Sequence, residues 1–295
     1  MFDYRYHALS LAAVLFALAL GVLIGVAIGD SNLVSSAKNG IVHNLNSELS
    51  DARSHATELQ GRLSEEEAFA NGLYPLAVHE LLTGRSVGLV FLGESSDQVN
   101  SLTRQAVTQA AGQLATVVAV REPLDLAGIA HDAAGTHYAA LAGSSERIKR
   151  FGELMGRQLV SGGQLVTKEL LSRVRGSLLS AFDGQLTHLE GLVVMRAEPS
   201  GMDAQASEDT AAFETGLLDG VAAAGIQAVG VELGGDSISQ VPWYKEKGLS
   251  SVDDLDTLAG QSALAYALAG ERGTFGVKST ADSLLPSVTA SSSGP

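Results

Sequence analysis

The hydrophobic pattern of the chain begins with an uninterrupted apolar run. From Ala8 to Ile28 there are 21 residues, and Ser10 is the one polar side chain among them. A helix of this length is about 31 Å long, which matches the hydrocarbon core of a bilayer. We therefore expect a membrane anchor over residues 1–30. The alternative is a cleaved signal peptide, but this run is longer than the roughly 7 to 15 apolar residues of a usual signal core.

Small residues recur at every fourth position of this run. This spacing lets two helix backbones approach closely inside a membrane. Small residues are also common in membrane helices that stay alone, so the alternative of no pairing remains. We predict self-association of the anchor along a stripe formed by Ala13, Ala17, Gly21, Gly25 and Gly29.

In the second segment, residues 31–75, apolar residues follow alternating spacings of three and four. These are the a and d positions of three heptads. Glu48 then falls at g and Arg53 at the following e, an attractive pair in a parallel dimer. We predict a parallel coiled-coil stalk, with an amphipathic helix that folds back on its own domain as the alternative. The seam consists of Val42, Leu45, Leu49, Ala52, Ala56, Leu59 and Leu63.

From about residue 84 onward, strand and helix patterns alternate. This alternation predicts the α/β class, with a doubly wound, mostly parallel sheet in an extracytoplasmic domain over residues 84–285. The tail at 286–295 has no core-forming pattern and is expected to be disordered. Strands are expected at 86–92, 114–120, 191–195 and 226–232, and helices at 97–111, 146–159, 164–182, 207–224 and from near Thr257 after a loop.

Charge and composition narrow the range of partners. The 19 Lys and Arg residues against 33 Asp and Glu residues give a formal net charge of −14. Such a chain repels phosphate backbones, so we expect no nucleic-acid partner. There is no cysteine, which excludes disulfides, thiolate metal sites and cysteine nucleophiles.

Motifs for catalysis are missing from the sequence. The first predicted strand is followed by Gly93-Glu-Ser-Ser-Asp97 instead of a dinucleotide-binding G-x-G-x-x-G, and the phosphate-loop, G-x-S-x-G and H-E-x-x-H patterns are absent. We therefore expect no enzyme and no catalytic residues, with an enzyme of unfamiliar type as the alternative.

Metal-ligand patterns are also weak. The His and Met residues are scattered and form no M-x-x-M or M-x-M array of the kind that binds Cu(I). Asp253, Asp254 and Asp256 are weak candidates for a site that binds a hard cation. The simpler interpretation is that these acids favour the positive N-terminus of the following helix, which Thr257 can cap.

The charges that flank the apolar run indicate its orientation. Arg5 and the amino terminus precede the run, whereas Asp30 follows it and the next basic residue is Lys38. By the positive-inside rule, the N-terminus is expected in the cytoplasm and the main domain outside it. The chain is thus predicted to be a single-pass protein of the cell membrane.

Three motifs together resemble one known family. They are H-A-x-S-L-A-A-V-x-x-A-L-A-x-G-x-x-x-G from His7 to Gly25, V-H-x-x-L-x-G-x-S-V from Val78 to Val87, and S-x-V-D-D-x-D from Ser250 to Asp256. In these residues the chain resembles the mycobacterial copper transport outer-membrane protein B family. The resemblance implies a role in copper homeostasis that lowers intracellular copper, and a pore role across the outer membrane.

The apolar anchor favours a binding or scaffold role over a pore, because a tightly paired Gly and Ala stripe leaves no polar channel lining. We expect a homodimeric cell-envelope protein that contacts the membrane and a further envelope protein. From the residues we expect no cofactor, and copper enters through the resemblance alone. The alternative is an envelope structural component that affects cell-wall assembly or permeability without handling copper.

Overall fold

The computed structural model describes residues 4–29, 31–163, 165–197 and 200–287. From residue 288 on, the predicted disordered tail lies outside the described residues. The chain divides into two units, Met1–Ala68 and Phe69–Pro295. The first unit holds α1 (Tyr4–Ile28) and most of the 47-residue helix α2 (Ser31–Ala77).

Helix α1 is the element predicted from the apolar run. Within the described ranges, it is the one helix that is long and apolar enough to cross a membrane, over Tyr4–Ala27. The side chains of residues 4–27 are exposed in the single chain. A helix of this length and composition supports membrane anchoring, and a signal sequence has the same properties.

The second unit is built on a sheet of seven strands in the order β3-β2-β1-β4-β5-β6-β7. Neighbouring strands are parallel except for β3, which is antiparallel to β2. The prediction of an α/β fold with a mostly parallel sheet is therefore confirmed. The strands are β1 (Ser86–Leu92), β2 (Gln113–Val120), β3 (Leu179–Gly184), β4 (Gly191–Arg196), β5 (Gln227–Val231), β6 (Ser250–Val252) and β7 (Thr274–Phe275).

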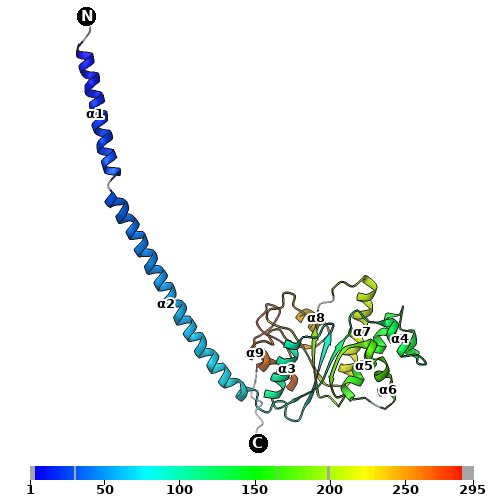
Figure 1. Cartoon of the computed structure of the whole chain (residues 1–295). Coiled ribbons are helices and arrows are strands. Elements are labelled where there is room, and N and C mark those ends of the chain that lie inside the picture. The colour runs from blue at the N-terminus through cyan, green and yellow to red at the C-terminus, as the bar shows by residue number, and fades with distance from the viewer. Residues whose placement is uncertain (1–3, 30, 164, 198–199, 288–295) are drawn as a thin grey trace. The chain divides into compact units, whose positions relative to one another are not determined.

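Helices cover both faces of this sheet (Figure 1). On β1, Leu89 and Phe91 join a core with α3 and α9, whereas Val90 and Leu92 join a second core with α5, α6 and α7. This alternation follows from the two-residue period of a strand that is buried on both faces. The helices are α3 (Asp97–Gln109), α4 (Leu126–Asp132), the 3₁₀ helix η1 (His137–Ala140), α5 (Ser145–Ser161), α6 (Leu165–Leu178), α7 (Ala204–Ala223), α8 (Val241–Glu246) and α9 (Leu258–Ala269).

The last turns of α2 contribute to the core of the sheet unit. Tyr74 of α2, and Val78 directly after this helix, are buried there with residues of α3 and α9. The Tyr266 hydroxyl donates a hydrogen bond to the carbonyl oxygen of Ala77 at 2.9 Å. Burial raises the pKa of Tyr74 to about 12. The C-terminal end of α2 is thereby fixed in the second unit.

One helix prediction was wrong. The helical pattern expected over 164–182 ends at Leu178, and Leu179–Gly184 form the strand β3. This segment pairs with β2, with Phe182 opposite Val118. Its backbone hydrogen bonds are therefore satisfied by a distant part of the chain, which local periodicity does not reveal. The expected loop before α9 likewise contains the short strand β6.

Helices α5 and α7 pack with their backbones in close contact. Gly152 and Gly156 lie one turn apart on α5, as do Gly216 and Gly220 on α7. A Cβ atom at any of these four positions would collide with the backbone of the other helix. Small residues spaced by four, like those on the anchor, therefore also form a helix contact inside the sheet unit.

Candidate functional site

The strands of the parallel part of the sheet all end at one edge. Strand order places β2 and β4 on opposite sides of β1, and the connections from β1 and β4 pass through α3 and α7 on opposite faces. In open α/β sheets, ligands bind outside the carboxyl ends of the strands, at the point where the strand order reverses. Here that point lies between β1 and β4.

Arg196 ends β4 at this edge. Its Nε atom donates to Glu214 Oε1 at 2.9 Å and its Nη2 atom to Glu214 Oε2 at 3.3 Å. Its Nη1 atom donates to Gln240 Oε1 at 2.7 Å, and its guanidinium carbon lies 4.7 Å from the centre of the Trp243 ring. The orientation of the guanidinium is thus fixed by three side chains, those of Glu214, Gln240 and Trp243.

Glu122, which follows β2, is the second carboxyl group beside Arg196. Burial, and then the charge of Glu214, raise its pKa to about 8, although Arg196 opposes the shift. Its Oε1 atom is buried and has no hydrogen-bond partner among the described residues. Burial also raises the pKa of Glu214, against the effect of Arg196. Glu122 therefore favours its protonated form more than an ordinary glutamate does.

A second polar cluster lies at the end of β5. The buried Glu232 accepts hydrogen bonds from Ser239 Oγ at 2.8 Å and from the Gln240 backbone N–H at 2.5 Å. Lys278 Nζ lies 2.8 Å from Glu232 Oε1 and also donates to the Leu233 carbonyl oxygen at 2.8 Å. This buried ion pair ties the segment after β7 to the centre of the sheet edge.

The three aspartates named as weak metal candidates bind separate partners. Asp253 accepts from the backbone N–H of Val277 at 2.8 Å, and Asp256 accepts from that of Gly234 at 2.7 Å. Asp254 accepts from Thr257 Oγ1 at 2.8 Å. In the part of the chain that the structure describes, no three His, Asp or Glu side chains are grouped as a metal site requires. The aspartates thus fasten loops at the sheet edge.

The cap predicted for the following helix is present. Thr257 Oγ1 accepts a hydrogen bond from the Gly260 backbone N–H at 2.9 Å, at the start of α9. Burial raises the pKa of Asp254, whose Oδ1 atom has no partner among the described residues. Capping is therefore confirmed as one role of this segment.

The predicted association surfaces lie in the first unit. Both are exposed in the single chain, so pairing between copies stays a prediction. Gly21 and Gly25 have open space where a side chain would be. Ala13, Ala17, Gly21 and Gly25 lie on α1, Gly29 follows it, and Val42, Leu45, Leu49, Ala52, Ala56, Leu59 and Leu63 lie on α2.

Sequence reasoning did not find the cluster of Arg196, Glu214 and Glu122. A signal was present, because Arg196 extends the apolar strand pattern GLVVM by one charged residue and Glu214 interrupts the apolar stretch AAFETGLL. A charge at a position that a periodic pattern buries requires a partner. The identity of that partner depends on strand order, which the sequence does not show.

Comparison with known proteins places the chain in a family. The model of the family described as "Copper transport outer membrane protein, MctB" matches residues 1–286. Proteins named "Copper transporter MctB" from Mycobacterium bovis and Mycobacterium tuberculosis are 26% identical over 189 residues. The alignment covers 61% of this chain and 60% of each relative, so it spans less than two thirds of the relatives' length. By the match over nearly its whole length, the chain belongs to the MctB family of copper transport outer membrane proteins.

Proposed function

We propose that this chain is a membrane-anchored, dimeric envelope protein that acts in copper homeostasis as a binding or scaffold component. The observation that carries the proposal is the family match over residues 1–286, which includes the apolar helix, the stalk and the sheet unit. The relatives are named for copper transport. We therefore propose that this chain takes part in copper homeostasis, and we do not assign it a pore.

The apolar seam of α2 supports a parallel dimer. In the single chain, Leu45 and Leu59 are more than 60% exposed, and Val42, Leu49 and Leu63 are about half exposed. Burial of a leucine contributes roughly 1.5–3 kcal/mol, so an unpaired seam of this kind favours a partner helix. Two anchored copies supply that partner in parallel orientation, and the stalk forms a coiled coil.

The edge of the sheet supports a binding role. In a doubly wound sheet, the point between β1 and β4 is where a ligand or partner binds. Arg196 and Glu122 lie at this edge, and the buried Oε1 atom of Glu122 has no hydrogen-bond partner among the described residues. We propose binding of an envelope protein or a small ligand at this edge, and no catalysis.

Cellular copper provides the test. A strain that lacks the gene should accumulate more copper than the parent strain, because the chain acts to lower it, and the wild-type gene should restore the parent level. Copper and zinc are measured together by elemental analysis, with zinc as the control metal. Unchanged copper in the deletion strain would remove the copper role.

A structural role in the envelope is the second candidate. The partners of Asp253, Asp254 and Asp256 favour it, because these carboxylates hold loops and the Thr257 side chain. In this case the purified full chain in nanodiscs does not bind Cu(I) or Cu(II), and the deletion strain takes up more of a hydrophilic dye. Dye uptake equal to that of the parent, together with copper binding by the protein, would contradict the structural role.

A further inference from the structure

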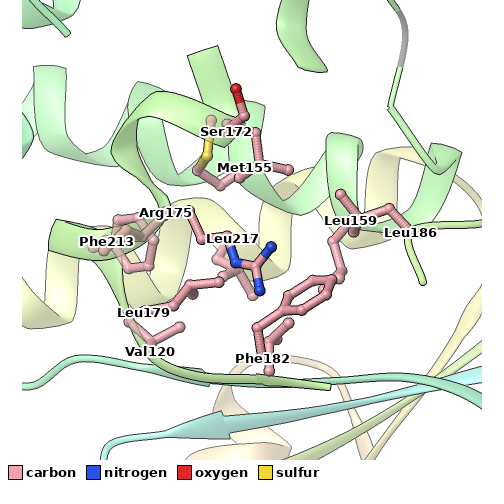
Figure 2. Close-up of a pocket in the computed structure, with 13 residues that line it drawn as sticks. Val120, Met155, Leu159, Ser172, Arg175, Leu179, Phe182, Leu186, Phe213 and Leu217 are labelled. Atoms are coloured by element: carbon pink, nitrogen blue, oxygen red, sulfur yellow. The ribbon is translucent and has the colours of Figure 1, made fainter. Parts of the chain in front are cut away.

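The second core contains a cavity of about 190 Å³ that belongs neither to the sheet edge nor to the stalk. It lies between helices α5, α6 and α7 on one side and strands β2 and β3 on the other (Figure 2). The wrongly predicted segment, β3, contributes Leu179 and Phe182 to its wall. The cavity therefore depends on β3, the antiparallel strand at the end of the strand order.

The interior of the cavity is apolar. Val118 and Val120 of β2 line it, together with Met155 and Leu159 of α5 and Phe213 of α7. Of the 13 lining residues in the described ranges, Ser172 and Arg175 are the polar ones. An apolar cavity of roughly 150 Å³ stays free of water and binds benzene. The side chains that line such a space lack contacts on one side, and an apolar ligand supplies them.

The two polar residues are both exposed to solvent at the mouth of the cavity, and the Ser172 hydroxyl points away from the Arg175 guanidinium (Figure 2). Ser172 and Arg175 are three positions apart on α6, so they share one face of that helix. The Arg175 guanidinium carbon lies 3.9 Å from the centre of the Phe182 ring (Figure 2). No ion pair recorded among the described residues involves Arg175. In a chain with a formal charge of −14, an exposed guanidinium without an acidic partner leaves a place for an external anion.

We propose that this cavity binds a medium-chain fatty acid, with the chain in the apolar interior and the carboxylate at Arg175. The volume suits one short chain of about six to ten carbon atoms, by comparison with the benzene-binding cavity. A planar guanidinium matches a carboxylate with two parallel hydrogen bonds. The Ser172 hydroxyl already donates to the Glu169 carbonyl oxygen at 2.9 Å, so Arg175 is the donor for the carboxylate. The assignment holds whether or not the chain acts on copper.

Calorimetric titration of the full chain in nanodiscs tests this, with octanoate as the probe and empty nanodiscs as the blank. We expect saturable binding of one octanoate per chain. Octanol, which lacks the charge, should bind about tenfold more weakly, since it cannot form charge-assisted hydrogen bonds with Arg175. Butyrate should also bind more weakly, because it fills less of the cavity. Equal affinities for octanoate and octanol would overturn the assignment.

Two variants separate the roles of the mouth and the interior. Arg175→Gln should weaken octanoate binding about tenfold and leave octanol binding unchanged. Arg150→Gln is the matched control, because Arg150 is an exposed arginine on α5 that does not line the cavity. Leu171→Trp, at a half-exposed lining position, should abolish binding of both probes. Octanoate binding that is equal in wild type, Arg175→Gln and a folded Leu171→Trp variant would contradict the proposal.

Discussion

Arg196 faces two carboxyl groups, those of Glu122 and Glu214, at the carboxyl edge of the sheet. Glu214 is 1% exposed and is ion-paired with Arg196, whose side chain is 12% exposed. A single guanidinium in such surroundings cannot compensate two full negative charges, because removing each charge from water costs several kcal/mol. Glu122 therefore keeps its proton to a higher pH than an ordinary glutamate.

The stability of the sheet unit should fall as pH rises from about 5 to about 8. The folded chain holds a proton on Glu122 up to about pH 8, whereas the unfolded chain releases it near the ordinary value of 4.5. Within this window the unfolded state binds fewer protons, so rising pH favours unfolding. In Glu122→Gln this loss should be smaller by on the order of 1–2 kcal/mol.

The measurement is urea unfolding of the full chain in nanodiscs at both ends of this pH range. Trp243, the single tryptophan of the chain, reports on the site by its fluorescence because it lies against Arg196. Glu94→Gln serves as the control, since Glu94 is an exposed residue that follows β1. If wild type and Glu122→Gln show the same dependence on pH, the raised pKa of Glu122 is refuted.

How far single residues could be predicted depended on how local their partners are. Thr257 caps α9 through an N–H three residues away, and the sequence alone predicted it. Arg196 and Glu214 are 18 positions apart. Glu122 follows β2 and joins them because the strand order places β2 two positions from β4, with β1 between them. Such pairing depends on strand order and therefore could not be predicted.

At the scale of elements, α2 is a helix of 47 residues with Pro75 near its end. Because proline lacks a backbone N–H, it removes one hydrogen bond from the interior of the helix. The residues between Val42 and Leu63 are helical and exposed in the single chain. A helix with its apolar positions exposed depends on a partner for much of its stability.

A cysteine at Leu49 should form a disulfide-linked dimer in membranes. Leu49 falls at an a position, where two parallel helices bring equivalent side chains together. Because the chain has no cysteine of its own, any dimer that is lost on reduction comes from the introduced residue. The readout is the dimer band on a non-reducing gel after mild oxidation.

Ser54→Cys is the matched control for this experiment. Ser54 falls at f, on the outer side of a two-helix coiled coil, so its dimer band should be several times weaker than that of Leu49→Cys. Bands of equal strength would indicate random collision in the membrane. Absence of any dimer for Leu49→Cys would favour the folded-back helix.

Long elements with a strong pattern were predicted well, and short ones were not. Strand β1 begins and ends at the predicted residues, because residues 87–92 are buried on both faces and form a continuous run without polar side chains. Strands β6 and β7 have three and two residues, and β3 is an edge strand with exposed side chains. These short segments form strands because a neighbouring strand supplies their backbone hydrogen bonds. The local hydrophobic pattern therefore does not identify them.

At the scale of the whole molecule, the apolar helix α1 and the acidic sheet unit belong to different surroundings. The span Tyr4–Ala27 suits a bilayer, whereas the formal charge of −14 keeps the rest of the chain in water. The distribution of basic residues around the span then determines on which side the sheet unit lies.

Protease added to intact spheroplasts should degrade the sheet unit. Arg5 precedes the span and Asp30 follows it, so the positive-inside rule predicts a cytoplasmic N-terminus. Loss of the full-length band on an immunoblot is the measurement, with a cytoplasmic protein as the control for intact membranes. A variant without residues 4–28 should remain inside and resist digestion. Protection of the wild-type chain in intact spheroplasts would reverse the assigned orientation.

The glycine contacts between α5 and α7 make the two sides of the fatty-acid cavity mechanically unequal. Met155 and Leu159 come from α5, and Phe213 and Leu217 from α7, a pair of helices whose backbones already touch. Two helices in such contact cannot move closer, so the wall formed by α5 and α7 keeps its shape. A longer or bulkier ligand can therefore be accommodated only if α6 and β3 move outward. How far these two elements can move determines the largest ligand that the cavity accepts.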